Sequence, residues 1–335
     1  MREESLPATI FHRLLDAIPP ASGAVVMGTG IVSVALLLDG NHLLSQILLV
    51  LDAVIWLALA VLLPARALRD GQRFLVDLRH PTALTSIAGT EVLGTRLTLA
   101  GWDWAGTALL IVGALIWLGL VPHVLRYWKT PTTGASFILT VATESLALLA
   151  ATLAFADRAG WLVYAALAPF CLGVCFYALV LARFDFRQLA VGIGDHWVTG
   201  GALAISTVAA GRMALAAQHT QSLTGAHGAL ETVALVLWCL TMVWLPALII
   251  AELLRPRLSY NVRRWSTVFP VGMYAACSFI VGDLTDTSGI SEFARVWVWI
   301  ALAVWALVAT GLARAAARAI SQAAGRQAHP LSGAG

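Results

Sequence analysis

The sequence has little charge for its length. Only 12% of its 335 residues are Asp, Glu, Lys or Arg, whereas a soluble domain has roughly 25%. Hydrophobic residues make up 59%, and the mean hydropathy is +0.83. This composition excludes an ordinary soluble domain and a disordered chain, and it indicates an all-α integral membrane protein.

Cysteine and catalytic motifs are also scarce. The four cysteines, Cys171, Cys175, Cys239 and Cys277, lie in apolar segments, so we expect small buried side chains and no disulfide framework or zinc site. No phosphate-binding glycine loop, HExxH or GxSxG occurs. We therefore expect no enzymatic activity, cofactor, metal or nucleic-acid partner.

Ten apolar segments are each near the length of about 20 residues that a bilayer requires. The stretch before them has no apolar core of a signal peptide, so we expect residues 1–19 to form a cytosolic tail. Residues 20–313 form the predicted membrane domain, and 314–335 a second cytosolic tail that is disordered or lies on the membrane. The segments are 20–38, 43–63, 81–100, 104–121, 135–155, 161–182, 196–216, 229–251, 265–284 and 294–313.

The positive charges are distributed unevenly between the connections. Seventeen Lys and Arg residues fall in the two tails and in every second connection, and only Arg158 and Arg295 fall in the others. Because cytoplasmic loops carry the excess of Lys and Arg, this predicts a cell-membrane protein with both termini in the cytoplasm.

Odd and even segments differ in composition. Odd segments contain small and hydroxyl-bearing stretches such as MGTGIVS (27–33) and TSIAGTEVLGT (85–95), whereas even segments are bulky and rich in tryptophan. Bulky apolar residues suit lipid, and small ones suit close packing or a polar path. Small residues alone would fit tight helix contacts equally well.

Embedded charges favour the polar path. Glu91, Arg96, Glu144, Arg212 and Asp283 all lie on odd segments, and the even segments carry Asp52 and, at an edge, Asp103. A charge at the bilayer centre costs on the order of 3 kcal/mol, so it usually faces a protein interior or water. We predict five helical hairpins, with five inner helices lining a central pore and five outer helices around them.

Three motifs in this order resemble the tellurite-resistance/dicarboxylate transporter family. That family includes TehA-type bacterial proteins, a yeast malate permease, fungal sulfite exporters and plant slow-type anion channels. The motifs are Pro20 followed by MGTGI, a His-Pro pair, and WSTVFP. Their residues include Met27, Gly28, Thr29, Gly30, His80, Pro81 and Trp265.

The resemblance implies a homotrimer whose subunits each have a pore plugged by a phenylalanine on the ninth helix. Phe269 is then the gate, and Pro270 would kink its helix. Ordinary packing is the alternative role for Phe269. If the helix begins at Trp265, Phe269 lies only about 6 Å along it, so a gate at mid-pore requires an earlier start or a deep vestibule.

The embedded charges allow two interpretations. Arg96 and Arg212 could concentrate anions at the outer mouth, while Glu91 or Glu144 carries a coupling proton. Alternatively these side chains form structural salt bridges, for example between Glu91 and Arg212. We expect His80 and His196 to cap helices rather than bind a ligand.

The predicted function is that of a membrane permease for a small anion, either proton-coupled or a strictly passive channel gated by phenylalanine. An intramembrane enzyme, for which Glu91 and Glu144 are the only candidate pair, is a remote alternative. C4-dicarboxylates, tellurite, sulfite, halides and nitrate are the candidate substrates that the resemblance implies.

Overall fold

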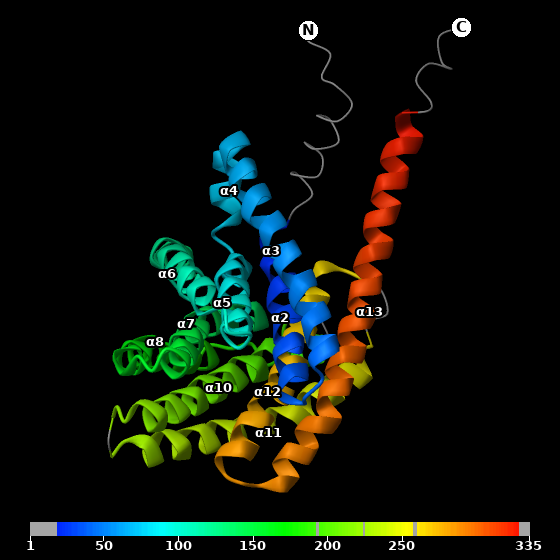
Figure 1. The fold of residues 1–335 in the computed structure, drawn as a ribbon. Coiled ribbons are helices and arrows are strands. Elements are labelled where there is room, and N and C mark those ends of the chain that lie inside the picture. The colour runs from blue at the N-terminus through cyan, green and yellow to red at the C-terminus, as the bar shows by residue number, and fades with distance from the viewer. Residues whose placement is uncertain (1–18, 192–193, 224, 257–259, 328–335) are drawn as a thin grey trace, which may run out of the picture.

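The computed structural model describes residues 19–191, 194–223, 225–256 and 260–327, and these residues are almost wholly helical (Figure 1). Short α4 (Gly71–Asp77) and α9 (Gln188–Val191) lie in connections. The longer helices are α2 (Gly23–Leu38), α3 (His42–Arg69), α5 (Thr85–Thr98), α6 (Asp103–Arg126), α7 (Ile138–Ala156), α8 (Gly160–Leu181), α10 (Trp197–Thr220), α11 (His227–Leu254), α12 (Trp265–Leu284) and α13 (Ser288–Gln327).

Five helices form a closed inner ring. Contacts join α2 to α5, α5 to α7, α7 to α10, α10 to α12, and α12 back to α2. Each ring helix also packs against the long helix that follows it in the chain, so α3, α6, α8, α11 and α13 surround the ring. The structure therefore contains an inner and an outer set of helices, as the sequence predicts.

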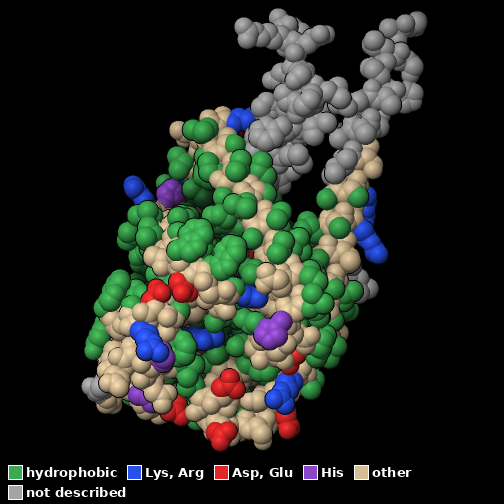
Figure 2. All heavy atoms as spheres, in the orientation of Figure 1, with side chains coloured by type: hydrophobic (Ala, Val, Ile, Leu, Met, Phe, Trp, Pro, Cys, Tyr) green, Lys and Arg blue, Asp and Glu red, His purple; other side chains and the backbone are tan. Residues whose placement is uncertain are grey.

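Burial separates the two sets in the same way. The apolar windows of α2, α7, α10 and α12 are 83–100% buried, whereas those of the five surrounding helices are only 17–33% buried. Leu43, Val61 and Leu115 are among the outer side chains left exposed. Hydrophobic side chains accordingly cover most of the visible surface in Figure 2. In water such a surface would be unfavourable, so it indicates contact with lipid.

Among the described residues, nine helices are long and apolar enough to cross a membrane, one fewer than the sequence predicts. The exception is the third segment, 81–100, where α5 is only 14 residues long. It carries Glu91 and Arg96 and several Thr and Gly residues, which lower its hydropathy. It nevertheless occupies a full position in the ring between α2 and α7.

Two further boundaries differ from the expectation. α13 continues to Gln327, so residues 314–327 are helical and not a disordered tail. Their alanine-rich sequence has high helix propensity, which explains the extension. α3 likewise continues to Arg69, beyond the predicted end at residue 63, because Arg66 and Arg69 suit the last turn of a helix.

Four of the ring helices begin with a turn of 3₁₀ helix. These turns are η1 (Pro20–Ser22), η2 (Pro81–Leu84), η3 (Gly134–Phe137) and η4 (Val262–Arg264), and they precede α2, α5, α7 and α12. Contacts between η1 and η2, η2 and η3, and η1 and η4 bring them together at one end of the ring. We call this the arginine-rich end, because Arg66 and Arg126 in the last turns of α3 and α6, Arg263 in η4, and Arg79 and Arg183 in the connections lie there.

Tryptophans of the outer helices hold the ring from outside. In each of four cases the indole N–H donates to a side-chain hydroxyl on a ring helix, across 2.9–3.0 Å. These tryptophans therefore point inward, whereas composition suggested a lipid-facing role for them. A buried indole N–H needs an acceptor, and the hydroxyls of the ring helices supply it. The pairs are Trp56 with Thr90, Trp117 with Thr143, Trp238 with Ser278, and Trp305 with Thr29.

Candidate functional site

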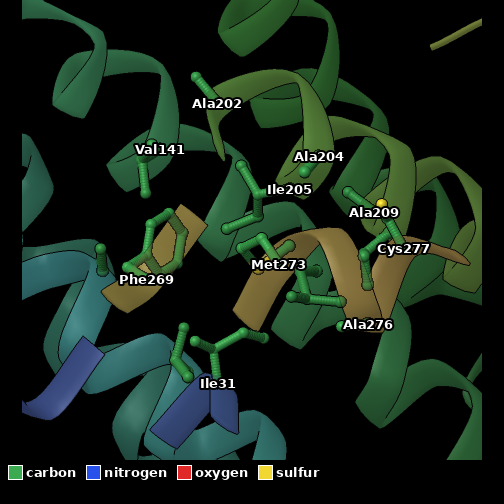
Figure 3. Close-up of a cluster of buried hydrophobic side chains, with 14 of the residues drawn as sticks. Ile31, Val141, Ala202, Ala204, Ile205, Ala209, Phe269, Met273, Ala276 and Cys277 are labelled. Carbon is green, nitrogen blue, oxygen red and sulfur yellow. The ribbon is translucent and has the colours of Figure 1, made fainter. Parts of the chain in front are cut away.

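Phe269 lies inside the ring. Its side chain is fully buried on α12, and Figure 3 shows it between ring helices together with Met273. Ile31 from α2, Val141 from α7 and Ile205 from α10 turn toward the same space. All of these side chains are apolar and buried. The interior of the ring at this level is therefore filled by hydrocarbon, with Phe269 as its largest side chain.

The start of α12 determines the depth of Phe269. The helical path begins at Val262 in η4 and continues directly into α12 at Trp265. Three residues at about 2.0 Å and four at about 1.5 Å place Phe269 about 12 Å along this path. That is twice the depth obtained when the helix is counted from Trp265.

Pro270 follows Phe269 within α12, where it removes one backbone hydrogen bond. Its ring packs against Gly201 of α10, because a Cβ atom on Gly201 would lie 2.8 and 2.9 Å from two Pro270 carbons. The glycine lets the two helices approach closely at this level. Pro270 thus fixes the contact between α10 and α12 immediately beside Phe269.

A small cavity lies within the ring toward the end opposite the arginines. Its volume is about 10 Å³, room for about one water molecule. Side chains from all five ring helices line it, and Arg212 is the one charged residue among them. Its other lining residues are Ile31, Val34, Leu38, Val92, Thr95, Leu148, Val208 and Ile280.

The two mid-ring carboxyl groups point away from this cavity. A Cβ atom on Gly113 of α6 would collide with the Glu91 carboxyl group, and one on Gly173 of α8 would lie 2.6 Å from Glu144 Oε1. Both acids therefore face outer helices. Ser206 donates a 3.0 Å hydrogen bond to Glu144 Oε1, while neither oxygen of Glu91 has a hydrogen-bond partner among the described residues.

This geometry separates the charges by sign. Arg212 contributes to the lining of the ring cavity, and Glu91 and Glu144 are directed between the ring and the outer helices. Glu91 makes no ion pair with Arg212 among the described residues. Asp283 is close enough to Arg212 to interact with it electrostatically, at the end of α12. An anion in the ring would meet a cation without meeting either mid-ring acid.

The family model described as voltage-dependent anion channel matches residues 17–313. The chain belongs to this family. An uncharacterized membrane protein of Mycobacterium tuberculosis, present in two strains, is 26% identical to it over 170 residues. The matched region covers 49% of this chain and 85% of that protein. Family membership supports anion transport across a membrane.

The MGTGI residues of α2 and Trp265 of α12 lie where the ring closes. Gly28 of α2 packs against Trp265 of α12, since a Cβ atom on Gly28 would lie 3.0 Å from the indole. The adjacent Thr29 accepts the hydrogen bond from Trp305, and Gly30 gives space to Asp52 of α3. The first motif therefore joins α2 to three neighbouring helices, and its Met27 is fully buried.

The second motif begins a ring helix. His80 precedes η2, where its Nδ1 accepts a 3.3 Å hydrogen bond from the backbone N–H of Thr82, and Pro81 occupies the first position of the turn. Desolvation and the positive charges of Arg263 and Lys129 lower the pKa of His80. The neutral form that caps η2 is thereby favoured near neutral pH. His196 occupies the N-cap position of α10, but, unlike His80, its side chain makes no capping hydrogen bond.

Arg96 lies at a junction of α2, α3 and α5. Its Nε donates to the hydroxyls of Ser33 and Ser45, each at 3.1 Å, and those two serines also bond to each other's carbonyl groups. Arg96 is 2% exposed and is not part of the lining of the ring cavity. The structure thus places Arg96 and Arg212 in different surroundings, although the sequence assigned them one role.

Replacing Arg96 with lysine is expected to destabilise the protein. The single N–H of Nε is shared between the two serine hydroxyls, and a lysine ammonium does not present a donor at that position. Loss of this charge-assisted hydrogen bond costs about 1.5–3 kcal/mol. Thermal unfolding of the purified protein measures the effect, with exposed Arg158→Lys as the control. An unfolding temperature equal to that of Arg158→Lys would contradict this role.

Three helix contacts at the site escape prediction from composition. Asp52, Glu91 and Glu144 each face a glycine of the adjoining helix, namely Gly30, Gly113 and Gly173. Glycine provides the space in which a carboxyl group fits between two helices. The sequence signal was present, since Gly113 and Gly173 interrupt two bulky outer segments.

Proposed function

We propose that the protein is a small-anion permease whose path runs along the axis of the ring. The main support for this proposal is the orientation of the charged side chains. Arg212 lines the ring cavity, whereas Glu91 and Glu144 are turned toward outer helices. A cation in a narrow passage of low dielectric constant raises the local concentration of anions. Glu91 and Glu144 do not oppose that effect along the ring, and Asp283 beside Arg212 offsets part of it.

In this proposal ten helices cross the membrane as five hairpins, with α5 as the shortest inner member. The arginine-rich end faces the cytoplasm, in agreement with the rule that cytoplasmic loops are positive. Phe269 closes the path from the cytoplasmic side of the ring cavity, and rotation of its side chain opens it. The family resemblance implies three copies, each with its own path.

Flux into proteoliposomes that contain the purified protein tests this function. Chloride, nitrate, sulfite, tellurite and malate are compared, each with and without a pH gradient. Passive transport predicts flux that follows the anion gradient alone. Failure of every anion to enter faster than into protein-free liposomes would refute the proposal, and uphill flux driven by a proton gradient would identify a coupled carrier.

The flux of a Glu91→Gln variant distinguishes a passive channel from a proton-coupled carrier. In the passive mechanism Glu91 lies outside the path, so the variant should keep the wild-type flux and its dependence on pH. The amide has nearly the shape of the neutral acid and fits the same space beside Gly113. A flattened pH profile measured in the same liposomes would instead assign Glu91 a coupling proton. Glu144→Gln provides the parallel comparison, although it also alters the bond with Ser206.

A further inference from the structure

A much larger cavity lies outside the ring. Its volume is about 580 Å³, within the roughly 300–1,000 Å³ typical of ligand pockets. Residues of α2, α3, α4, α5 and α6 line it. In Figure 1, α3 with α4 stands on one side of α5 and α6 stands on the other.

The walls of this cavity are aliphatic along most of its length. Leu59, Leu63 and Ala67 of α3 and Val112 and Ile116 of α6 are among the lining residues. Charged and imidazole groups enter the lining near α4, where Arg66, Asp77 and His123 contribute. The cavity is therefore amphiphilic, with an apolar length and a polar end at the arginine-rich side.

The polar end is built by short-range contacts. Arg66 forms an ion pair with Asp77 and lies 5.9 Å from the centre of the Phe74 ring. His123 Nε2 is 3.3 Å from the carbonyl oxygen of Leu75. These contacts join the ends of α3 and α6 to α4 and hold α4 over this end of the cavity.

The cavity is separate from the proposed path. Gly23 of α2 and Gly89 of α5 both line it, and a Cβ atom on Gly89 would lie 2.9 Å from the Gly23 carbonyl oxygen. α2 and α5 therefore meet without intervening space at this level. An occupant would contact the outside of two ring helices without entering the ring.

We propose that this cavity binds one acyl chain of an anionic phospholipid, taken from the leaflet at the arginine-rich end. The aliphatic walls match a hydrocarbon chain that is already in the surrounding bilayer. The polar end matches a headgroup, and the exposed Arg73 of α4 and Arg79, two residues beyond α4, favour a negative one. A polypeptide segment would instead need partners for its backbone N–H and C=O groups, which the aliphatic walls do not offer.

Gly119 permits a direct test because it lines the cavity and a Cβ atom there would have nothing within 4 Å. Gly119→Trp directs a large side chain from α6 into the cavity, starting from a position with open space at Cβ, and Gly119→Leu introduces a smaller one. Leu118→Trp is the matched control, since Leu118 is adjacent, 63% exposed and outside the cavity lining.

Native mass spectrometry of the purified protein, titrated with phosphatidylglycerol or phosphatidylcholine, measures the binding. Wild type and Leu118→Trp should bind one phosphatidylglycerol about tenfold more tightly than phosphatidylcholine, given two nearby arginines. Gly119→Trp should lose this binding, and Gly119→Leu should weaken it. Arg73→Gln with Arg79→Gln should remove the headgroup preference and keep the bound chain.

Three results would overturn the proposal. Equal lipid binding by Gly119→Trp and wild type would place the lipid elsewhere, and equal affinity of wild type for both lipids would exclude a headgroup site. A change in subunit number on Gly119→Trp without a change in lipid binding would assign the cavity to a second copy of the chain. The measurement needs no anion flux, so its outcome is independent of the proposed function.

Discussion

Phe269→Ala is expected to raise anion flux into proteoliposomes by about tenfold or more, which corresponds to a barrier lower by about 1.4 kcal/mol. Phe269 is the largest side chain that Figure 3 shows within the ring, and alanine leaves an opening where its phenyl group stood. Ile31, Val141 and Ile205 come from other helices and cannot close the gap without movement of those helices. Flux should rise for every anion that the protein transports.

Val268→Ala is the matched control for this variant. Val268 precedes Phe269 on α12 and is equally buried, but it contacts Gly28 at the seam with α2. Its truncation should lower stability and leave flux near the wild-type level. If Phe269→Ala lowers stability without raising flux, Phe269 is an ordinary packing residue. Size-exclusion chromatography of each variant establishes that the compared proteins are folded.

Arg212→Gln should produce the opposite change, a fall in flux of about tenfold or more. At an effective dielectric constant of about 20, a cation about 4 Å from an anion stabilises it by about 4 kcal/mol. Asp283 offsets part of this attraction. A remaining stabilisation of about 1.4 kcal/mol, about a third of the full attraction, is enough to change the flux tenfold. Because Arg212 is the one charged residue lining the ring cavity, no other lining side chain replaces its effect.

Arg158→Gln provides the control for Arg212→Gln. Arg158 lies in the connection between α7 and α8, at the same end of the ring, and its side chain is exposed. The two variants change the net charge equally, so a specific effect of Arg212 appears as a difference between them. Equal flux in both variants would mean that Arg212 does not act on the permeating anion. The flux ratio should also persist at high salt, because a buried cation is poorly screened.

The embedded charges show which features of the structure can be predicted from composition. Their presence on odd segments predicted that these helices face the protein interior. Glu91, Arg96, Glu144 and Arg212 are buried, whereas Asp283 is exposed at the end of α12. Composition did not reveal which neighbour each charge meets. Arg96 bonds to two serines, whereas Arg212 lies on the ring cavity, although both are arginines near the ends of inner helices.

The third segment shows a feature that composition could not predict. The sequence predicts a membrane span at 81–100 like the other nine, but α5 is only 14 residues long and its polar residues lower its hydropathy. Only its contacts with α2 and α7 show that it completes the ring. The outer tryptophans illustrate the same point, because four of them donate hydrogen bonds inward to hydroxyl groups that lie far away in the sequence.

Residue type and spacing along the chain were enough to predict a membrane protein with two kinds of helix. The tertiary structure decided which side chains face the axis of the ring. Successive residues on a helix differ in direction by about 100°, so a helix rotation of one residue exchanges a pore-facing side chain for a buried neighbour. Here Gly113 and Gly173 make room for Glu91 and Glu144 away from the axis, and Phe269 and Arg212 remain within it.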